Sequence, residues 1–439
     1  MTSTCHDSGR RDSIPRNVTR SRIHPAWFVL AAVALAMMTA SGVRTAFGVY
    51  VKPMEAELGW SRAALSQVAA LSLFLLGMAS PLAGRLADRW GARRVIAFSI
   101  VLLGVGTISS AFVHELWHVY ITAGILMAVG SGGAGLTAGS TVIARWFEAR
   151  RGLAIGIAGA AISLGQLGII PLAAVLALHQ GWRVSYLVLG LGLLVLVFPI
   201  VARILRNEPE AQGLQPYGAT GPLRTSIEAA ELQRAGRVSL TEAARFPQLW
   251  LLMATQFVCG YTSLGMVLTH FMPHALEHGF TEIQASMALG LMGAMNVVGT
   301  IASGWICDRL GRCGPLATFY LLRGVSLLLL PYVWNVPSLQ VWAVIFGLNY
   351  FSTVPPTTTL TVNIFGRYSV GELSGWIFFA HQVGAALGAA IAGWAFEWSG
   401  AYTSAFVSAA VMAFLGSALT LLIREEPIHS RPMPVSAPA

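Results

Sequence analysis

Long apolar runs alternate with short polar connections along almost the whole of this 439-residue chain. Twelve of the runs are close to or above the ~20 residues that an α-helix needs to cross about 30 Å of hydrocarbon. They occupy residues 26–50, 62–84, 94–113, 116–143, 152–178, 183–204, 247–274, 282–304, 314–334, 338–363, 371–396 and 401–423. Because backbone groups in lipid must form hydrogen bonds within their own segment, we predict an all-α membrane protein with twelve transmembrane helices.

One polar connection is much longer than the others and separates two sets of six helices. It contains Pro, Gly, Gln, Glu and Arg, which predicts a linker with one surface helix near residues 225–246. The predicted segments are a basic cytoplasmic tail, an N-terminal six-helix bundle, a cytoplasmic linker, a C-terminal six-helix bundle and a second cytoplasmic tail, at residues 1–25, 26–204, 205–246, 247–423 and 424–439.

The two sets of helices carry the same landmarks in the same order. One short sequence appears twice, 220 positions apart, as Gly84-Arg85-Leu86-Ala87-Asp88-Arg89-Trp90-Gly91 and as Gly304-Trp305-Ile306-Cys307-Asp308-Arg309-Leu310-Gly311. Four glycines recur 219 positions apart, as Gly152, Gly156, Gly165 and Gly181 and as Gly371, Gly375, Gly384 and Gly400. We infer a duplicated chain whose two bundles are related by a pseudo-twofold axis along the membrane normal.

Composition excludes a soluble protein. Hydrophobic residues make up 55% of the chain and charged residues only 11%, whereas soluble domains carry about 25% charged residues. A soluble fold cannot hide this much apolar surface, so a bilayer must cover it.

The basic residues indicate topology. If the N-terminus is inside, the outer connections hold only Lys52, Arg62 and Arg183, and Arg44 and Arg323 lie within helices. The other Lys and Arg residues then lie on the side of the two termini, which the positive-inside rule assigns to the cytoplasm. The net charge of +9 is therefore spread over many connections, and we expect no nucleic-acid partner.

Each copy of the repeated sequence resembles the loop between helices 2 and 3 of the major facilitator superfamily, usually written G-x-L-A-D-R-x-G-R-K. One departure is Ala92, which stands where the family usually has a basic residue. The resemblance implies a transporter that works by alternating access, with a latch that holds the two halves together on the cytoplasmic side. We expect the aspartates to face helix N-termini and neighbouring Arg side chains. The alternative is a plain topological turn. The latch candidates are Gly84, Asp88, Arg89, Gly91, Gly304, Asp308, Arg309 and Gly311.

Arg44 lies within the outer half of the first predicted helix, where a charge by default marks a functional site. The alternative is that its side chain reaches the outer surface. Its surroundings resemble the branch of monocarboxylate porters and oxalate:formate antiporters, in which a basic residue on helix 1 serves anionic substrates. The chain departs from the porters on helix 8, where Asn296 and Thr300 replace an Asp and an Arg. This departure weakens the case for a carboxylate-based proton relay.

Other polar residues are placed within predicted helices that line the central cavity in this family. His381 can change its charge near neutral pH, so it is the candidate proton carrier, with a packing histidine as the alternative. Pro355 and Pro356 must break the predicted tenth helix, and broken membrane helices are tolerated where they line a cavity. The substrate-binding candidates are Arg44, Tyr50, Gln166, Tyr261, Asn296, Tyr350, His381 and Gln382.

Two features have no assigned role. Arg323 lies too deep to reach the surface, on a helix that is peripheral in this family, so a functional role and a structural bond to helix 8 or 10 stay open. His270, His274 and His278 share one helical face, but no carboxylate or cysteine joins them at that spacing. We expect no metal site.

The sequence therefore predicts a secondary transporter for a small organic anion such as a carboxylate. The alternative is an efflux transporter for drugs or other hydrophobic or neutral compounds. The chain has no P-loop, so we expect no direct use of ATP, no cofactor and no enzymatic activity. We expect a monomer in the cell membrane that contacts lipid and a small-molecule substrate. The substrate, the direction of transport and the use of a coupling proton stay open.

Overall fold

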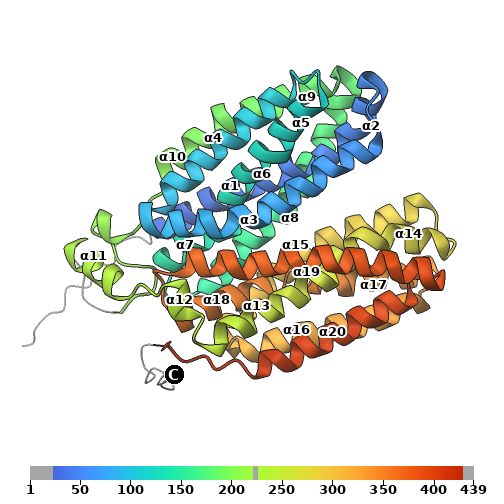
Figure 1. The fold of residues 1–439 in the computed structure, drawn as a ribbon. Coiled ribbons are helices and arrows are strands. Elements are labelled where there is room, and N and C mark those ends of the chain that lie inside the picture. Colours follow the sequence, from blue (N-terminus) through green and yellow to red (C-terminus); the bar gives the residue numbers. More distant parts are fainter. Residues whose placement is uncertain (1–22, 221–225, 429–439) are drawn as a thin grey trace, which may run out of the picture.

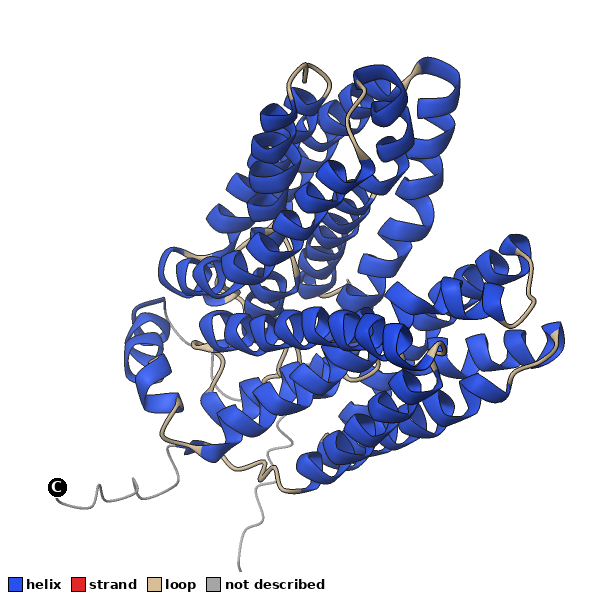
Figure 2. Ribbon diagram, turned by 45° about the vertical axis from the view of Figure 1, so that its right-hand side comes forward, coloured by secondary structure: helices blue, strands red, loops and turns tan. Residues whose placement is uncertain are grey.

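The computed structural model describes residues 23–220 and 226–428 (Figures 1 and 2). Within these ranges the chain is helical and forms no β-strand, apart from one isolated bridge between Phe147 and Tyr217. Most of the two predicted tails lies outside the described residues, and the exact boundaries of the predicted segments stay predictions.

Eleven segments of the described chain are long and apolar enough to cross a membrane. A twelfth segment is split by a break between residues 349 and 354. In the first half the helices are α1 (Pro25–Thr45), α2 (Phe47–Leu58), α3 (Arg62–Trp90), α4 (Ala92–Ser110), α5 (Leu116–Val119), η1 (Tyr120–Leu126), α6 (Met127–Gly133), α7 (Leu136–Trp146), α8 (Arg151–Gln180), α9 (Trp182–Gly192), η2 (Leu193–Val197) and α10 (Phe198–Ile204).

The described part of the linker contains three short helices, where the sequence predicted one. These are η3 (Glu210–Gln212), α11 (Ser226–Ala235) and α12 (Leu240–Ala243). In the second half the helices are α13 (Pro247–Gly260), η4 (Tyr261–Leu268), α14 (Thr269–Glu277), α15 (Glu282–Leu310), α16 (Cys313–Leu329), η5 (Leu330–Tyr332), α17 (Val336–Asn349), α18 (Val354–Phe365), α19 (Val370–Ser399) and α20 (Thr403–Leu421).

The repeated sequence is helical, although we expected it to form a loop. α3 continues through it to Trp90, and α15 continues to Leu310. Each helix stops at the glycine that follows, Gly91 with φ of +89° and Gly311 with φ of +82°. A glycine adopts this backbone conformation without the steric cost that a side chain would add, so it ends the helix within one residue.

The predicted tenth helix is broken, as its two prolines indicated. α17 ends at Asn349 and α18 begins at Val354, so the break lies just before Pro355 and Pro356. Both prolines lie in the first turn of α18, where a missing backbone N–H costs no helical hydrogen bond. The break is therefore the start of a new helix.

The two halves lie side by side and diverge toward the end that carries α2, α9 and α14, whereas they meet near the linker helices α11 and α12 (Figure 1). α3 packs against α19, and α8 packs against α15. Each of these contacts joins one helix of the first half to one helix of the second half. The two contacts follow the pseudo-twofold relation that the duplication predicts.

Glycines allow the closest approaches between helices. A Cβ on Gly165 would collide with the carbonyl of Met38, and a Cβ on Gly384 would collide with the carbonyl of Phe257. Each residue of the second pair lies 219 positions after its counterpart in the first pair. The recurring glycines therefore mark helix crossings that occur once in each half, as expected where membrane helices pack backbone to backbone.

Candidate functional site

A cavity of about 650 Å³ lies between the two halves. Its wall comes from α1, α3 and α8 of the first half and from α15, α18 and α19 of the second, with smaller contributions from other helices. Most of the lining residues are apolar, so the few polar side chains decide what the cavity can recognise.

Arg44 provides the one formal charge on this wall among the described residues. It lies one residue before the end of α1, where the chain bends at Ala46 into α2. Its side chain is half-buried, and within residues 23–220 and 226–428 it has no hydrogen-bond or ion-pair partner. A positive charge without a partner on an apolar wall can attract the anionic group of a bound molecule.

Five other predicted residues line the cavity with Arg44: Gln166, Asn296, Tyr350, His381 and Gln382. Asn296 connects the halves, because its Nδ2 donates to the Ser163 hydroxyl over 2.7 Å. Gln166 donates to the Ser41 hydroxyl over 3.2 Å. The His381 ring is buried and stacks on Phe378, with ring centroids 5.6 Å apart and planes 9° apart.

Tyr50 and Tyr261 do not line the cavity. The Tyr50 hydroxyl is paired with that of Ser185 over 2.9 Å, and the Tyr261 hydroxyl is paired with that of Ser408 over 3.0 Å. Both tyrosines are buried between helices of their own half, and they leave the set of substrate-binding candidates.

Ser41 and Phe378 are among the lining residues that the sequence reasoning missed. Ser41 precedes Arg44 by three residues, and Phe378 precedes His381 by three residues. Residues three apart lie on the same face of a helix, so this spacing was the signal that could have identified them.

Asp88 and the residues around it form what we call the first junction, which consists of Gly84, Arg85 and Asp88 of α3 with Gly371 and Glu372 of α19. The backbone N–H groups of Gly371 and Glu372 donate to the Asp88 carboxylate over 3.1 and 2.8 Å. Arg85 and Glu372 form an ion pair of 2.6 Å across the halves. The Asp88 side chain is only 2% exposed. A carboxylate from one half thus caps the first turn of a helix from the other half.

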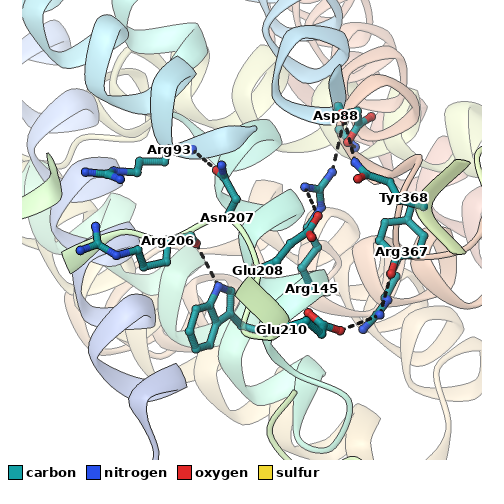
Figure 3. A network of polar contacts seen from close by, with 12 residues as sticks. Asp88, Arg93, Arg145, Arg206, Asn207, Glu208, Glu210, Arg367 and Tyr368 are labelled. Atoms are coloured by element: carbon teal, nitrogen blue, oxygen red, sulfur yellow. Dashed lines mark hydrogen bonds and ion pairs between the residues drawn. The ribbon is translucent and has the colours of Figure 1, made fainter. Parts of the chain in front are cut away.

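The linker contacts both halves beside this junction (Figure 3). Glu208 pairs with Arg145 of α7 over 3.0 Å, and Glu210 pairs with Arg367 over 2.9 Å. Burial alone lowers the pKa of Arg367, but Tyr368 and Glu210 outweigh it, so the pKa is raised above its ordinary value. The raised pKa keeps the Arg367 guanidinium positively charged near neutral pH.

The second junction consists of Gly304 and Asp308 of α15 with Gly152 and Leu153 of α8. The N–H groups of Gly152 and Leu153 each donate to the Asp308 carboxylate over 2.8 Å. The glycines are in reciprocal contact, because a Cβ on Gly304 would collide with the Gly152 carbonyl and the reverse also holds. Gly84 and Gly371 are related in the same way in the first junction.

The other residues of the predicted latch lie at the edge of the junctions. Arg89 and Arg309 are exposed, and the Arg309 guanidinium lies 4.2 Å from the Trp305 ring centre. Gly91 and Gly311 end their helices with positive φ. The structure thus brings both aspartates to helix N-termini, as their sequence context predicted, and leaves the two following arginines on the surface.

Comparisons with known proteins agree on the family. The sequence model of the Major Facilitator Superfamily matches residues 33–382 and 277–438. The uncharacterized MFS-type transporter YcxA of Bacillus subtilis (strain 168) is 26% identical over 373 residues, covering 82% of this chain and 86% of that protein. Monocarboxylate transporter 11 of Mus musculus is 28% identical over 379 residues, covering 82% of this chain and 79% of that protein.

Solved structures share the fold. The proton:xylose symporter XylE bound to 6-bromo-6-deoxy-D-glucose aligns with a TM-score of 0.69 at 16% identity, covering 91% of this chain and 96% of that one. The human organic anion transporter MFSD10 (TETRAN) aligns with a TM-score of 0.66 at 15% identity, covering 90% and 99%. With its duplicated junctions, its central cavity and these matches, the chain belongs to the major facilitator superfamily and is a multi-pass membrane protein that acts as a secondary transporter.

Proposed function

We propose that this transporter moves a small organic anion, such as a carboxylate, through the central cavity. The observation that carries the proposal is Arg44, a charged side chain on a largely apolar wall that has no partner among the described residues. Such a wall suits a molecule with one anionic group and an apolar body. Relatives named as monocarboxylate transporters at 23–28% identity support the same class of substrate.

We infer that the linker and both termini are cytoplasmic and that the protein lies in the cell membrane. The basic residues gather on that side, which supports this orientation. The two junctions then close the cytoplasmic end while the halves diverge toward the outside (Figure 1). Breaking both junctions would open the cavity to the cytoplasm and complete an alternating-access cycle.

Replacing Arg44 tests the substrate class. Loss of a charge-assisted hydrogen bond costs about 1.5–3 kcal/mol, so Arg44→Gln is expected to weaken apparent affinity for pyruvate or benzoate roughly ten- to a hundredfold. Arg44→Lys keeps the charge but loses the planar fork, and should retain part of the affinity. Uptake into proteoliposomes is the measurement, with Arg62→Gln on the exposed surface as the matched control.

Equal anion affinity in the Arg44→Gln variant and the parent would remove the anion proposal. The second candidate, efflux of neutral or hydrophobic compounds, is favoured by the apolar wall and by Asn296 and Thr300 at the helix 8 positions. Thermal stabilisation of the purified protein by carboxylates and by neutral drugs separates the two, because a bound ligand raises stability by mass action.

His381 is the residue that we propose to carry a coupling proton. It lines the cavity, and imidazole changes its charge in the physiological range of pH. Replacement by Gln should flatten the dependence of pyruvate uptake on pH between about 5 and 8. A variant that keeps the parent profile would assign the proton, if one is used, to another group.

A further inference from the structure

Arg323 is completely buried within the second half, on α16, and it does not line the cavity. No carboxylate pairs with it among the described residues. Its Nη2 instead donates to the carbonyls of Asn349 and Tyr350, over 2.6 and 2.8 Å. Its Nη1 donates to the Cys259 thiol sulfur over 3.2 Å and to the Thr262 hydroxyl over 3.3 Å. The sequence left a bond to helix 8 or 10 as one possible role, and the bond to the tenth helix is confirmed.

The two carbonyls are among those that the break in the tenth helix leaves without helical partners. In a continuous helix, Asn349 and Tyr350 would accept hydrogen bonds from the N–H groups four residues later. The Val354 N–H instead donates to Phe351 over 3.0 Å, in a tighter turn. A carbonyl left without a donor inside a bilayer is costly, and Arg323 supplies donors for both.

Two side chains of α15 bind further backbone groups at the break. Pro356 has no N–H for the Ser352 carbonyl, and the Ser303 hydroxyl donates to that carbonyl over 2.5 Å. Asn296 accepts the Phe351 N–H over 2.9 Å. Neighbouring helices thus supply donors for the carbonyls at 349, 350 and 352, and the Val354 N–H supplies the donor for the carbonyl at 351.

The corresponding segment of the first half is also broken, and the residue that matches Arg323 is not an arginine. This fourth transmembrane segment is interrupted at Ala134 and Gly135, between α6 and α7. There Gly130 lies directly against the backbone of Leu103, which occupies the position on α4 that matches Arg323 on α16. Close packing of glycine in the first half is replaced by a guanidinium bridge in the second.

We propose that Arg323 is a positioning residue that holds the break in the tenth helix and so fixes the part of the cavity wall formed by Tyr350 and Phe351. The planar guanidinium suits this role, because one nitrogen reaches two carbonyls while the other reaches α13 and η4. The effect on transported molecules rests on the proposed function, whereas the effect on the break does not.

Hydrogen–deuterium exchange of the purified protein without substrate tests the positioning role. Arg323→Met is expected to raise the exchange rate of the amides at 350–354 by at least about tenfold, because the break loses its charged donor. Arg323→Lys should give a smaller increase. Ser303→Ala, which releases a different carbonyl of the break, should also act locally. Thr318→Val, on the exposed side of α16, is the matched control and should change nothing at the break.

Two results would overturn the proposal: unchanged exchange at 350–354, or an increase spread equally over all helices of the second half. If Arg323→Met does not fold, the Lys variant decides between the same outcomes. A second arm compares the apparent KM values for acetate and benzoate, whose ratio should change in Arg323→Lys because the wall has moved. If the parent transports neither acid, the proposed function fails while the exchange result still stands.

Discussion

The two junctions have the same backbone geometry and different side chains. In both, an aspartate near the end of a long helix accepts two N–H groups from the first turn of a helix in the other half. In both, a pair of glycines brings the two backbones into contact. Asp88 is buried, however, whereas Asp308 is half-buried.

The side chains differ most at one pair of positions. The ion pair of Arg85 and Glu372 in the first junction has Trp305 and Leu153 at the matching positions of the second. The first junction is also supported by the linker, through Glu208 and Arg145.

The second junction is supported by the segment after the last helix. Glu425 accepts a hydrogen bond from Asn363 over 2.7 Å and pairs with Arg312 over 3.2 Å. Asn363 in turn accepts from Arg151 of the first half over 3.0 Å. The comparison indicates that the capping of a helix by an aspartate is the common device, because it depends on backbone N–H groups that substitutions do not alter. Flanking charges can differ between the halves.

The largest effect is expected from Asp88→Asn. The amide keeps one acceptor but places an NH₂ group against backbone N–H donors and removes a buried negative charge near Arg145. We expect the closed state to lose about 2–3 kcal/mol, or roughly a 30- to 150-fold change in the closing equilibrium. Spin labels at the exposed positions 90 and 310 should report a longer distance, with lower transport and normal insertion. A parent-like distance distribution would contradict this prediction.

Gly84→Ala and Gly304→Ala are expected to act equally on the two junctions. Each added methyl group would collide with a backbone carbonyl, of Gly371 or Gly152, which cannot move aside without separating the halves. The expected cost is about 1–3 kcal/mol for each variant. The same labels measure it, and Gly290→Ala, where a Cβ has open space, is the control. If the closing equilibria of the two variants differ by more than tenfold, the two junctions are not equivalent.

Asp308→Asn should have a smaller effect than Asp88→Asn. Asp308 accepts hydrogen bonds from the same number of N–H groups but is half-buried. Water can therefore replace part of the hydrogen bonding that the variant loses. We expect about 1–1.5 kcal/mol, near tenfold in the closing equilibrium. The two variants are best compared side by side in one label background. An effect as large as that of Asp88→Asn would mean that burial does not distinguish the junctions.

The smallest effect is expected from making the first junction resemble the second. Arg85→Trp with Glu372→Leu removes an ion pair whose arginine is 46% exposed, and such pairs contribute about 0–1 kcal/mol. We expect less than about a fivefold change in the closing equilibrium, and less still at high salt. A shift as large as that of Asp88→Asn would show that the ion pair, and not the capping aspartate, holds this end closed.

Several features of the fold and the site follow from the sequence because they depend on one segment at a time. The apolar runs indicate the number of membrane helices, the repeated motif indicates the duplication, and the two prolines indicate the broken helix. The aspartates at 88 and 308 were expected to face helix N-termini, because an anion is favoured there. Arg44 was singled out because a charge in a membrane helix is costly.

Tertiary structure alone decided which residues meet. Tyr50 and His381 both lie in apolar helices. The Tyr50 hydroxyl is hydrogen-bonded to another helix of its own half, whereas His381 lines the cavity. The sequence indicated that Arg323 lies deep in the membrane, but its hydrogen-bond partners lie 26 to 64 positions away along the chain. The hydropathy pattern along the chain indicates how deep in the bilayer a residue lies. The rotation and crossing of each helix are set by packing against several neighbours at once, so only the assembled bundle determines what each polar group contacts.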